Sequence, residues 1–174
     1  MRMKQMLLIA VLTIFLFACK NNKQQASGVQ KSSVTLPYTA TYSSSFSNEV
    51  SDEDLQTVLQ TYKDWAEGNV TNLASAFADT IDFDSWDGES MRLSRYELSR
   101  KWVKYRDSLR SVDLTIEAWH KMYSTDKKDA FIVVWYKEID THKNGTADSA
   151  RWHDINMIKN GKIVWYSQYR RPLK

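Results

Sequence analysis

Two acidic side chains in an otherwise apolar stretch, Asp82 and Asp84, have a spacing suited to acid–base chemistry. They alternate with Ile81 and Phe83, and this period of two predicts a short strand that carries both carboxylates on one face. A carboxylate held in a pocket can act as a general base. The same pattern also fits a solvated strand edge or the turn before Gly88, which would leave both aspartates without a chemical role.

A third aspartate, Asp154, lies between an aromatic and an amide side chain on its own face of a predicted strand. Burial there would favour the neutral form and raise the pKa of the carboxyl. His153 precedes it, and because neighbouring side chains on a strand point to opposite faces, the two cannot form a catalytic dyad. A structural alternative is a buried carboxylate paired with Arg95, Arg100 or another nearby cation.

The three histidines, His120, His142 and His153, show no metal-ligand spacing, so we expect no metal. His120 has the strand parity of the apolar positions of residues 112–118, which predicts that it lies on the apolar face as a wall residue. Cys19 is the only cysteine, so a chain that carries a lipid there has no disulfide and no thiol nucleophile. No cofactor is expected.

Large aromatic side chains are abundant: the chain of 174 residues has seven Trp, nine Tyr and six Phe. Such rings either fill a core or line an apolar cavity that offers ring faces and a few polar tips to a ligand. The predicted pocket consists of Tyr62, Trp65, Trp102, His120, Trp135, Trp152, Asp154 and Tyr166.

The N-terminal residues have the pattern of an export signal. Two positive charges are followed by an apolar run from Met6 to Ala18 that is too short to cross a bilayer of roughly 30 Å. The run ends in Leu16-Phe17-Ala18-Cys19, which resembles the bacterial lipobox, whose cysteine is lipidated and becomes the new N-terminus. We therefore predict a signal peptide over residues 1–18 and an anchor at Cys19, with the protein on the cell envelope.

Residues 19–48 are predicted to form a lipidated, flexible tether, because residues 20–48 are dominated by Ser, Thr, Gln and Asn and hold no acidic residue. The 24 Lys and Arg outnumber the 21 Asp and Glu only slightly, and loss of a signal peptide holding Arg2 and Lys4 would reduce the excess by two. This balance excludes an electrostatic footprint for nucleic acid. The remaining partners are the membrane and an unidentified small molecule.

Residues 49–174 are predicted to form one α+β domain with three helices at its start. The first helix begins at Ser51 and ends at Gly68, a short second helix follows Asn69, and Ser94 with Glu97 forms a capping box for the third. After residue 111 the period changes to two, which predicts an antiparallel meander to the C-terminus, with hairpin turns at residues 144–145 and 160–161.

The order of these elements, with three local stretches, resembles the nuclear transport factor 2-like superfamily and its SnoaL-like group. The stretches are Ala66-Glu67-Gly68-Asn69, Phe77-Ala78-Asp79-Thr80-Ile81-Asp82-Phe83, and Trp152 to Ile163 around the last hairpin. The resemblance implies a cone: helices packed on a strongly curved, mainly antiparallel sheet, with a pocket between them. It also implies that a homodimer can form through the outer face of the sheet.

Alignment with the ketosteroid isomerases of this superfamily implies a general base at Asp84 and a protonated carboxylic acid at Asp154. The sequence departs from that pattern at the isomerase tyrosine, where Thr61 stands, with Tyr62 turned about 100° round the helix. A three-residue turn with a bulge in the last hairpin pairs Asp154 with Tyr166, and we favour it over a two-residue turn, which pairs Asp154 with Ser167.

Three functions remain open at this point. The favoured hypothesis is an envelope lipoprotein that binds a small apolar or aromatic molecule, with Asp154 and Tyr166 as polar anchors. The second is a cofactor-independent isomerase, lyase or hydrolase in which Asp84 and Asp154 divide the base and acid roles. The third is a protein-interaction or assembly module that uses the outer face of the sheet.

Overall fold

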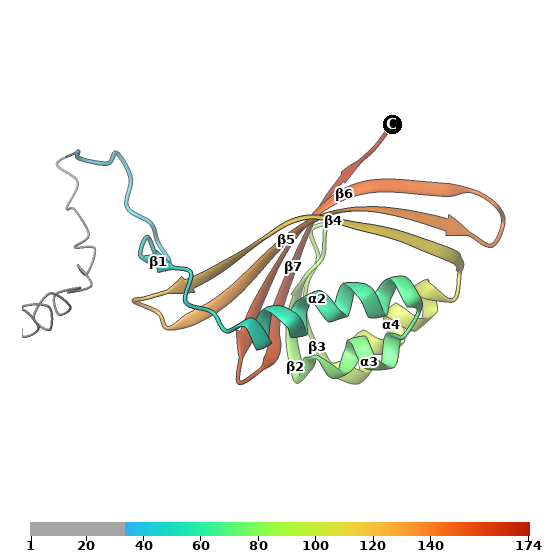
Figure 1. The fold of residues 1–174 in the computed structure, drawn as a ribbon, viewed down its shortest axis with the longest axis horizontal. Coiled ribbons are helices and arrows are strands. Elements are labelled where there is room, and N and C mark those ends of the chain that lie inside the picture. Colours follow the sequence, from blue (N-terminus) through green and yellow to red (C-terminus); the bar gives the residue numbers. More distant parts are fainter. Residues whose placement is uncertain (1–33) are drawn as a thin grey trace, which may run out of the picture. The chain divides into compact units, whose positions relative to one another are not determined.

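The computed structural model describes residues 34–174, and the compact unit that carries the candidate site spans Ala40–Lys174. One curved sheet of seven strands makes up one layer, and the helices lie together against one of its faces (Figure 1). This arrangement confirms the predicted α+β cone. None of the helices among residues 34–174 is long and apolar enough to cross a membrane.

Helix α2 (Asp52–Glu67) begins and ends where the sequence predicts. The Ser51 hydroxyl accepts a hydrogen bond from the backbone N–H of Asp54, and Gly68 ends the helix in the left-handed conformation, with φ of 80°. Helix α3 (Val70–Ser75) follows, but Asn69 makes no capping hydrogen bond with its side chain and donates to Glu67 instead.

Helix α4 (Arg95–Arg106) starts with the predicted capping box, in which Ser94 and Glu97 satisfy each other's backbone N–H groups. At its other end, the Arg106 guanidinium donates to the carbonyl oxygens of Trp65 and Ala66, at 3.1 Å each. Because these carbonyls belong to the last turn of α2, Arg106 joins the two helices that flank the site.

The sheet has the strand order β1-β4-β5-β6-β7-β2-β3. Strands β4, β5, β6 and β7 form the predicted antiparallel meander, and β2 pairs with β7 in parallel. The strand bounds are β1 (Phe46–Ser47), β2 (Phe77–Asp84), β3 (Ser90–Ser94), β4 (Leu109–Ser124), β5 (Asp129–His142), β6 (Ala147–Lys159) and β7 (Lys162–Pro172).

Two of these strands lie where the sequence does not predict them. Strand β3 pairs antiparallel with β2, so that Asp82 faces Arg92 and Asp84 faces Ser90. Strand β1 lies inside the predicted tether and pairs with the end of β4, where Phe46 faces Ser124. The last residues assigned to the tether, from Ala40, therefore belong to the compact unit.

Bulges in β4 and β7 change which side chains face the helices. In β4, Ile116 pairs with Tyr136 and Ala118 with Trp135, so Glu117 is an extra residue and the parity of the strand reverses after it. In β7, the extra residue falls between Ile163 and Trp165. Both bulges move residues that the sequence analysis placed by simple alternation.

The register of the last hairpin differs from both predicted alternatives. The turn has two residues, 160–161, but the bulge after it pairs Asp154 with Gln168 and Asn156 with Tyr166. Asn160 and Gly161 have φ of 53° and 70°, the positive values that a two-residue hairpin turn needs. Tyr166 still lies on the same sheet face as Asp154, so their closeness survives the change of register.

The core lies between the sheet and the helices. Val58 of α2, Leu98 of α4, Ile132 and Val134 of β5 and Ile163 of β7 are almost completely buried within it. Their burial holds α2 and α4 against the inner face of the sheet, and the candidate site lies between these same elements.

Candidate functional site

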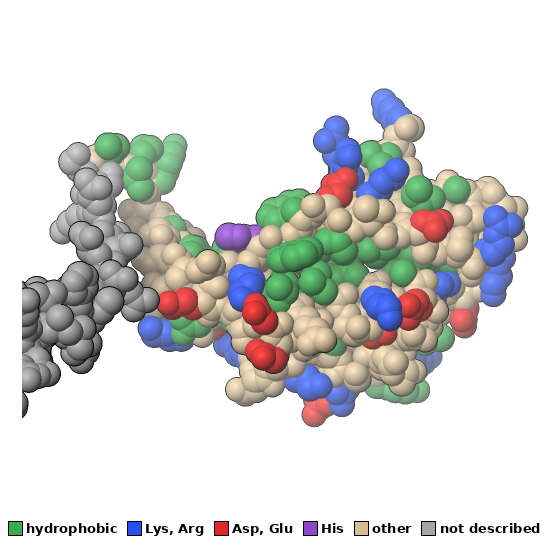
Figure 2. All heavy atoms as spheres, viewed as in Figure 1, with side chains coloured by type: hydrophobic (Ala, Val, Ile, Leu, Met, Phe, Trp, Pro, Cys, Tyr) green, Lys and Arg blue, Asp and Glu red, His purple; other side chains and the backbone are tan. Residues whose placement is uncertain are grey.

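A cavity of about 540 Å³ lies between the inner face of the sheet and helices α2 and α4. In Figure 2, hydrophobic side chains gather in the middle of the face shown, between the strands and the helices of Figure 1. Ten of the 21 residues that line the cavity are aromatic: Tyr62, Trp65, Phe77, Phe83, Trp86, Trp102, Tyr105, Tyr136, Trp152 and Tyr166.

Asp154 of β6 lies directly behind this lining and is completely buried. Three tyrosine hydroxyls that face the cavity donate to its Oδ2 atom: Tyr62 at 3.2 Å, Tyr136 at 3.1 Å and Tyr166 at 2.5 Å. Its Oδ1 atom is buried without a hydrogen-bond partner among residues 34–174. The carboxyl therefore reaches the cavity through the three hydroxyls.

Burial controls the protonation of this cluster. It raises the pKa of Asp154 to about 7, because desolvation of the carboxylate outweighs the hydrogen bonds from the tyrosines, which favour the ionised form. Burial, followed by repulsion from Asp154, also raises the pKa of Tyr62, Tyr136 and Tyr166 well above the ordinary value. The tyrosines are thus hydrogen-bond donors at any physiological pH.

Amide side chains complete the polar wall behind the cavity. The Asn156 side chain donates to the Ile132 carbonyl at 3.2 Å and to the Tyr62 hydroxyl at 3.4 Å. The Gln168 side chain donates to the Tyr166 hydroxyl at 2.8 Å. Each tyrosine hydroxyl that receives such a bond is oriented to donate toward Asp154. No cation among residues 34–174 takes part, so the predicted structural pairing of Asp154 with Arg95 or Arg100 is wrong.

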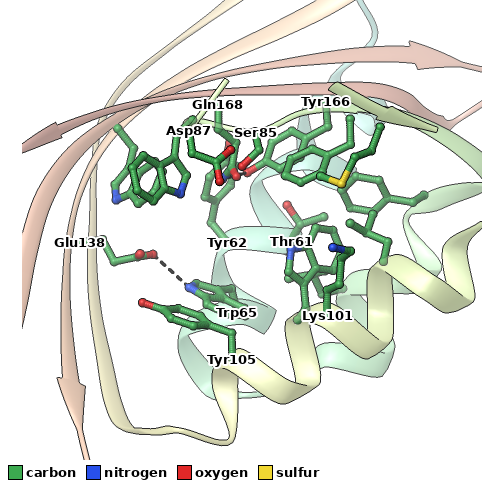
Figure 3. Close-up of a pocket in the computed structure, with 18 of the residues that line it drawn as sticks. Thr61, Tyr62, Trp65, Ser85, Asp87, Lys101, Tyr105, Glu138, Tyr166 and Gln168 are labelled. Carbon is green, nitrogen blue, oxygen red and sulfur yellow. Dashed lines mark hydrogen bonds between the residues drawn. The ribbon is translucent and has the colours of Figure 1, made fainter. Parts of the chain in front are cut away.

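A second group of acidic side chains lies on β5. Glu138 extends toward the space above α2 and α4, where the Trp65 ring nitrogen donates to it at 3.0 Å (Figure 3). Tyr105 donates its hydroxyl to Asp140 at 2.8 Å and stacks parallel to Trp65, with 6.1 Å between ring centroids. Burial, followed by repulsion from Asp140, raises the pKa of Glu138 to about 8, and burial also raises that of Asp140.

Five of the eight predicted pocket residues line the cavity: Tyr62, Trp65, Trp102, Trp152 and Tyr166. Asp154 lies just behind them. Tyr62, and not the aligned Thr61, reaches Asp154 from α2, although Thr61 also lines the cavity.

The other two predicted residues do not line the cavity. His120 is exposed, because the bulge at Glu117 reverses the parity of β4 and places His120 opposite Val133 on the outer face. Trp135 lies on the same outer face, where it stacks on His153 with 4.9 Å between ring centroids. Both assignments to the pocket are therefore corrected.

Asp84 also lies outside the cavity. It accepts hydrogen bonds from the Trp165 ring nitrogen and the Ser90 hydroxyl, both at 2.7 Å, on the sheet face away from the helices. Phe83, the residue before it, is the one that lines the cavity. Because Asp84 and Asp154 lie on opposite faces of the sheet, they cannot divide acid and base work in one site.

Sequence reasoning missed the contribution of β5 to the site. Tyr136, Glu138 and Asp140 all line the cavity, but the pocket predicted from the sequence includes none of them. These three residues alternate, and the period of two could have shown that a phenol and two carboxylates share one face. The almost continuous apolar and aromatic composition of the strand hid this signal.

No protein-family model matches this chain, and a comparison with curated protein sequences finds no match. Solved structures do resemble it. An LEH-like epoxide hydrolase from M. tuberculosis has a TM-score of 0.58 at 8% identity, with 69% of this chain and 84% of that one covered. An ntf2-like protein of unknown function from Burkholderia pseudomallei has a TM-score of 0.54 at 15% identity, covering 68% of this chain and 91% of its own.

A hypothetical protein from Catenulispora acidiphila, with a ketosteroid isomerase-like fold and in complex with trimethylamine, has a TM-score of 0.54 at 16% identity. The match covers 66% of this chain and 84% of that one. These similarities show that the chain has the nuclear transport factor 2-like fold, as the sequence analysis predicted. Because one fold of this kind carries many activities, the function has to be argued from the site.

Cys19 and the predicted signal peptide lie outside the described residues. Within residues 34–174, no three His, Cys, Asp or Glu side chains cluster as metal ligands would. The buried acidic groups at the cavity are Asp154 with its tyrosine cluster, Glu138 and Asp140, and the lining also includes the polar or charged side chains of Thr61, Ser85, Asp87, Glu89, Lys101 and Gln168.

Proposed function

We propose that this protein is a lipid-anchored lipoprotein of the bacterial cell envelope whose cavity binds a small apolar or aromatic molecule. The observation that carries the proposal is the cavity itself: about 540 Å³, walled by aromatic rings and backed by three hydroxyls on one buried carboxyl. Concave sites with apolar walls and a few fixed polar groups are the usual form of small-molecule pockets.

The wall and its polar backing have different roles in this proposal. Ring faces such as those of Trp65 and Trp102 supply contact area and favour flat or apolar ligands. The Tyr166 hydroxyl, held by Gln168 and Asp154, is a fixed polar anchor for one end of the ligand. Two proteins of the same fold, the epoxide hydrolase-like protein and the protein in complex with trimethylamine, are consistent with a small-molecule role.

Retention of a bound molecule tests the proposal. The full chain, purified from bacterial membranes in mild detergent, should show by native mass spectrometry a mass increment that disappears after denaturation. Tyr166→Phe should lower the retained fraction roughly tenfold, because it removes a buried polar anchor. Tyr169→Phe is the matched control, since Tyr169 is exposed on the same strand and does not line the cavity.

A chain that carries no bound molecule and takes up none of a set of small aromatic compounds would contradict the proposal. Equal retention by the Tyr166→Phe and Tyr169→Phe variants would instead remove Tyr166 as the anchor.

A further inference from the structure

Three buried carboxyl groups adjoin the cavity, and none of them has an ion-pair partner in the part of the chain that the structure describes. Glu138, Asp140 and Asp154 are 7%, 6% and 0% exposed. The salt bridges of residues 34–174 all lie elsewhere, on side chains that are more exposed. Burial of an unpaired carboxylate costs several kcal/mol, so such groups normally take up a proton or meet a cation.

Their hydrogen bonds leave Glu138 and Asp140 with unused acceptor capacity. Glu138 receives one bond, from the neutral Trp65 ring nitrogen. Asp140 receives one bond on Oδ2 from Tyr105, and its Oδ1 atom is buried without a partner among the described residues. An ionised carboxylate can accept about four hydrogen bonds. Both groups line the cavity, so a ligand there can donate the hydrogen bonds that these carboxyl groups lack.

Among residues 34–174, no cation near the cavity forms an ion pair with Glu138 or Asp140. Arg106 donates to the last carbonyls of α2. Arg170 pairs with Asp148 at 2.5 Å and lies over the rings of Trp86 and Trp152. Lys101 lines the cavity from α4 but is exposed. Arg170 therefore attracts Glu138, and His142 and Arg106 attract Asp140, without an ion pair to either carboxyl group among residues 34–174.

Aromatic rings surround these carboxyl groups, and the Arg170 guanidinium already lies over one of them, the Trp152 ring. Trp65 and Tyr105 stack in parallel on the helix side, and Tyr136 and Trp152 stack on the sheet side, with 6.2 Å between centroids. A ring face stabilises an ammonium group through its quadrupole, most strongly when water is excluded. Carboxylates and ring faces together make a site suited to a desolvated organic cation.

We propose that the molecule bound in this cavity is an organic cation, an ammonium group on an apolar or aromatic body, with Glu138 and Asp140 as its counter-charges. The inference rests on the proposed function and specifies the charge of its ligand. Such a ligand supplies the ion-pair partner that the two carboxyl groups lack among residues 34–174, while its apolar part packs against the remaining rings.

Binding should depend on pH in a defined direction. The titratable and charged groups that interact with Glu138 come from every element around it: Asp140 and Tyr136 on its own strand, Asp154 on β6, Arg170 and Tyr166 on β7, and Tyr62 and Tyr105 on the helices. A cation favours the ionised form of Glu138, whose pKa without ligand is about 8. The affinity for a quaternary ammonium, which has no proton of its own, should therefore rise as the pH increases toward 8.

Calorimetric titration of the full chain in lipid nanodiscs tests the inference. The probes are benzyltrimethylammonium and its uncharged carbon isostere neopentylbenzene, with empty nanodiscs to subtract partitioning. The cation should bind roughly tenfold or more tightly than the isostere. Glu138→Gln, which keeps an acceptor for Trp65, should remove most of this preference and its pH dependence. Asp140→Asn is the second variant, and Asp84→Asn on the outer face is the matched control.

Each outcome of the titration either supports or overturns the cation inference. Equal or tighter binding of the uncharged isostere overturns the cation inference but leaves the proposed function standing. Equal loss in the Asp84→Asn variant also overturns it, because the effect would then come from overall charge. Binding of neither probe nor of longer trimethylammonium compounds overturns the cation inference, whereas the proposed function is decided separately by retention of a bound molecule and by uptake of the set of small aromatic compounds.

Discussion

Asp154 gives the molecule a pH-dependent stability whose sign follows from its raised pKa. In the folded chain its pKa is about 7, whereas an unfolded chain has the ordinary value near 3.8. Between these values the folded state holds a proton that the unfolded state has lost. The stabilisation is therefore fully present below the lower value and is lost as the pH rises through about 7.

The variant Asp154→Asn should be less sensitive to pH than the parent chain. The amide imitates the neutral acid, with its oxygen available to the three tyrosine hydroxyls. Between pH 5 and pH 8 the parent should lose on the order of 2 to 4 kcal/mol of unfolding free energy through Asp154, and the variant should not lose this part. Urea unfolding at both pH values measures the difference. Parallel losses in the two chains would contradict the assignment.

Arg106 links helices α2 and α4, in addition to the shared core and the stacking of Trp65 on Tyr105. The last turn of α2 contains no basic residue of its own, and Arg106 of α4 supplies the donors for its terminal carbonyls. Gly68, which ends α2, leaves room for this contact, since a Cβ atom there would lie 3.4 Å from the Arg106 guanidinium. The cavity wall that carries Trp65 and Tyr105 is thus held by Arg106.

Replacement of Arg106 by alanine should lower the free energy of unfolding by roughly 1 to 3 kcal/mol, because two partly buried carbonyls lose a charged donor. It should also weaken ligand binding, since Trp65 lines the cavity and its carbonyl loses the hydrogen bond from Arg106. Arg100→Ala is the control, because this exposed side chain of α4 lies over the Tyr96 ring of the same helix. Denaturant unfolding of both variants checks the prediction, which fails if their stabilities agree.

The outer face of the sheet remains a second surface of the whole molecule. Trp135 and Tyr169 are 37% and 56% exposed there, and both contact His153 between them. Exposed aromatic side chains on one sheet face are compatible with the homodimer or the interaction module considered in the sequence analysis. Both stay predictions.

Membrane attachment is the prediction that concerns the chain as a whole. Bacteria grown with an alkyne analogue of palmitate should label the parent chain and leave Cys19→Ala unlabelled, and the variant should leave the membrane fraction. The physical reason is that several acyl chains, at about 0.8 kcal/mol per buried methylene, hold a protein stably on a bilayer. Membrane-bound, unlabelled parent chain would contradict the lipid anchor.

Local sequence patterns were sufficient to predict much of the fold and part of the candidate site. Ser51, Gly68 and the Ser94 capping box placed the ends of α2 and the start of α4, because caps depend on residues within one turn of each other. Alternation along β6 placed Asp154 on the inner face, and five of the expected aromatic side chains line the cavity. These features need only short-range geometry.

Only the tertiary structure decided which face several other side chains occupy. The bulges in β4 and β7 depend on how a curved sheet packs against the helices, and one extra residue reverses every later position. The sheet face of His120 and the register of the last hairpin were mispredicted for this reason. The position of Asp84 was mispredicted because its sheet face depends on which strands β2 pairs with. The gathering of three tyrosines on Asp154, from α2, β5 and β7, likewise arises from contacts far apart in the sequence, which no local pattern encodes.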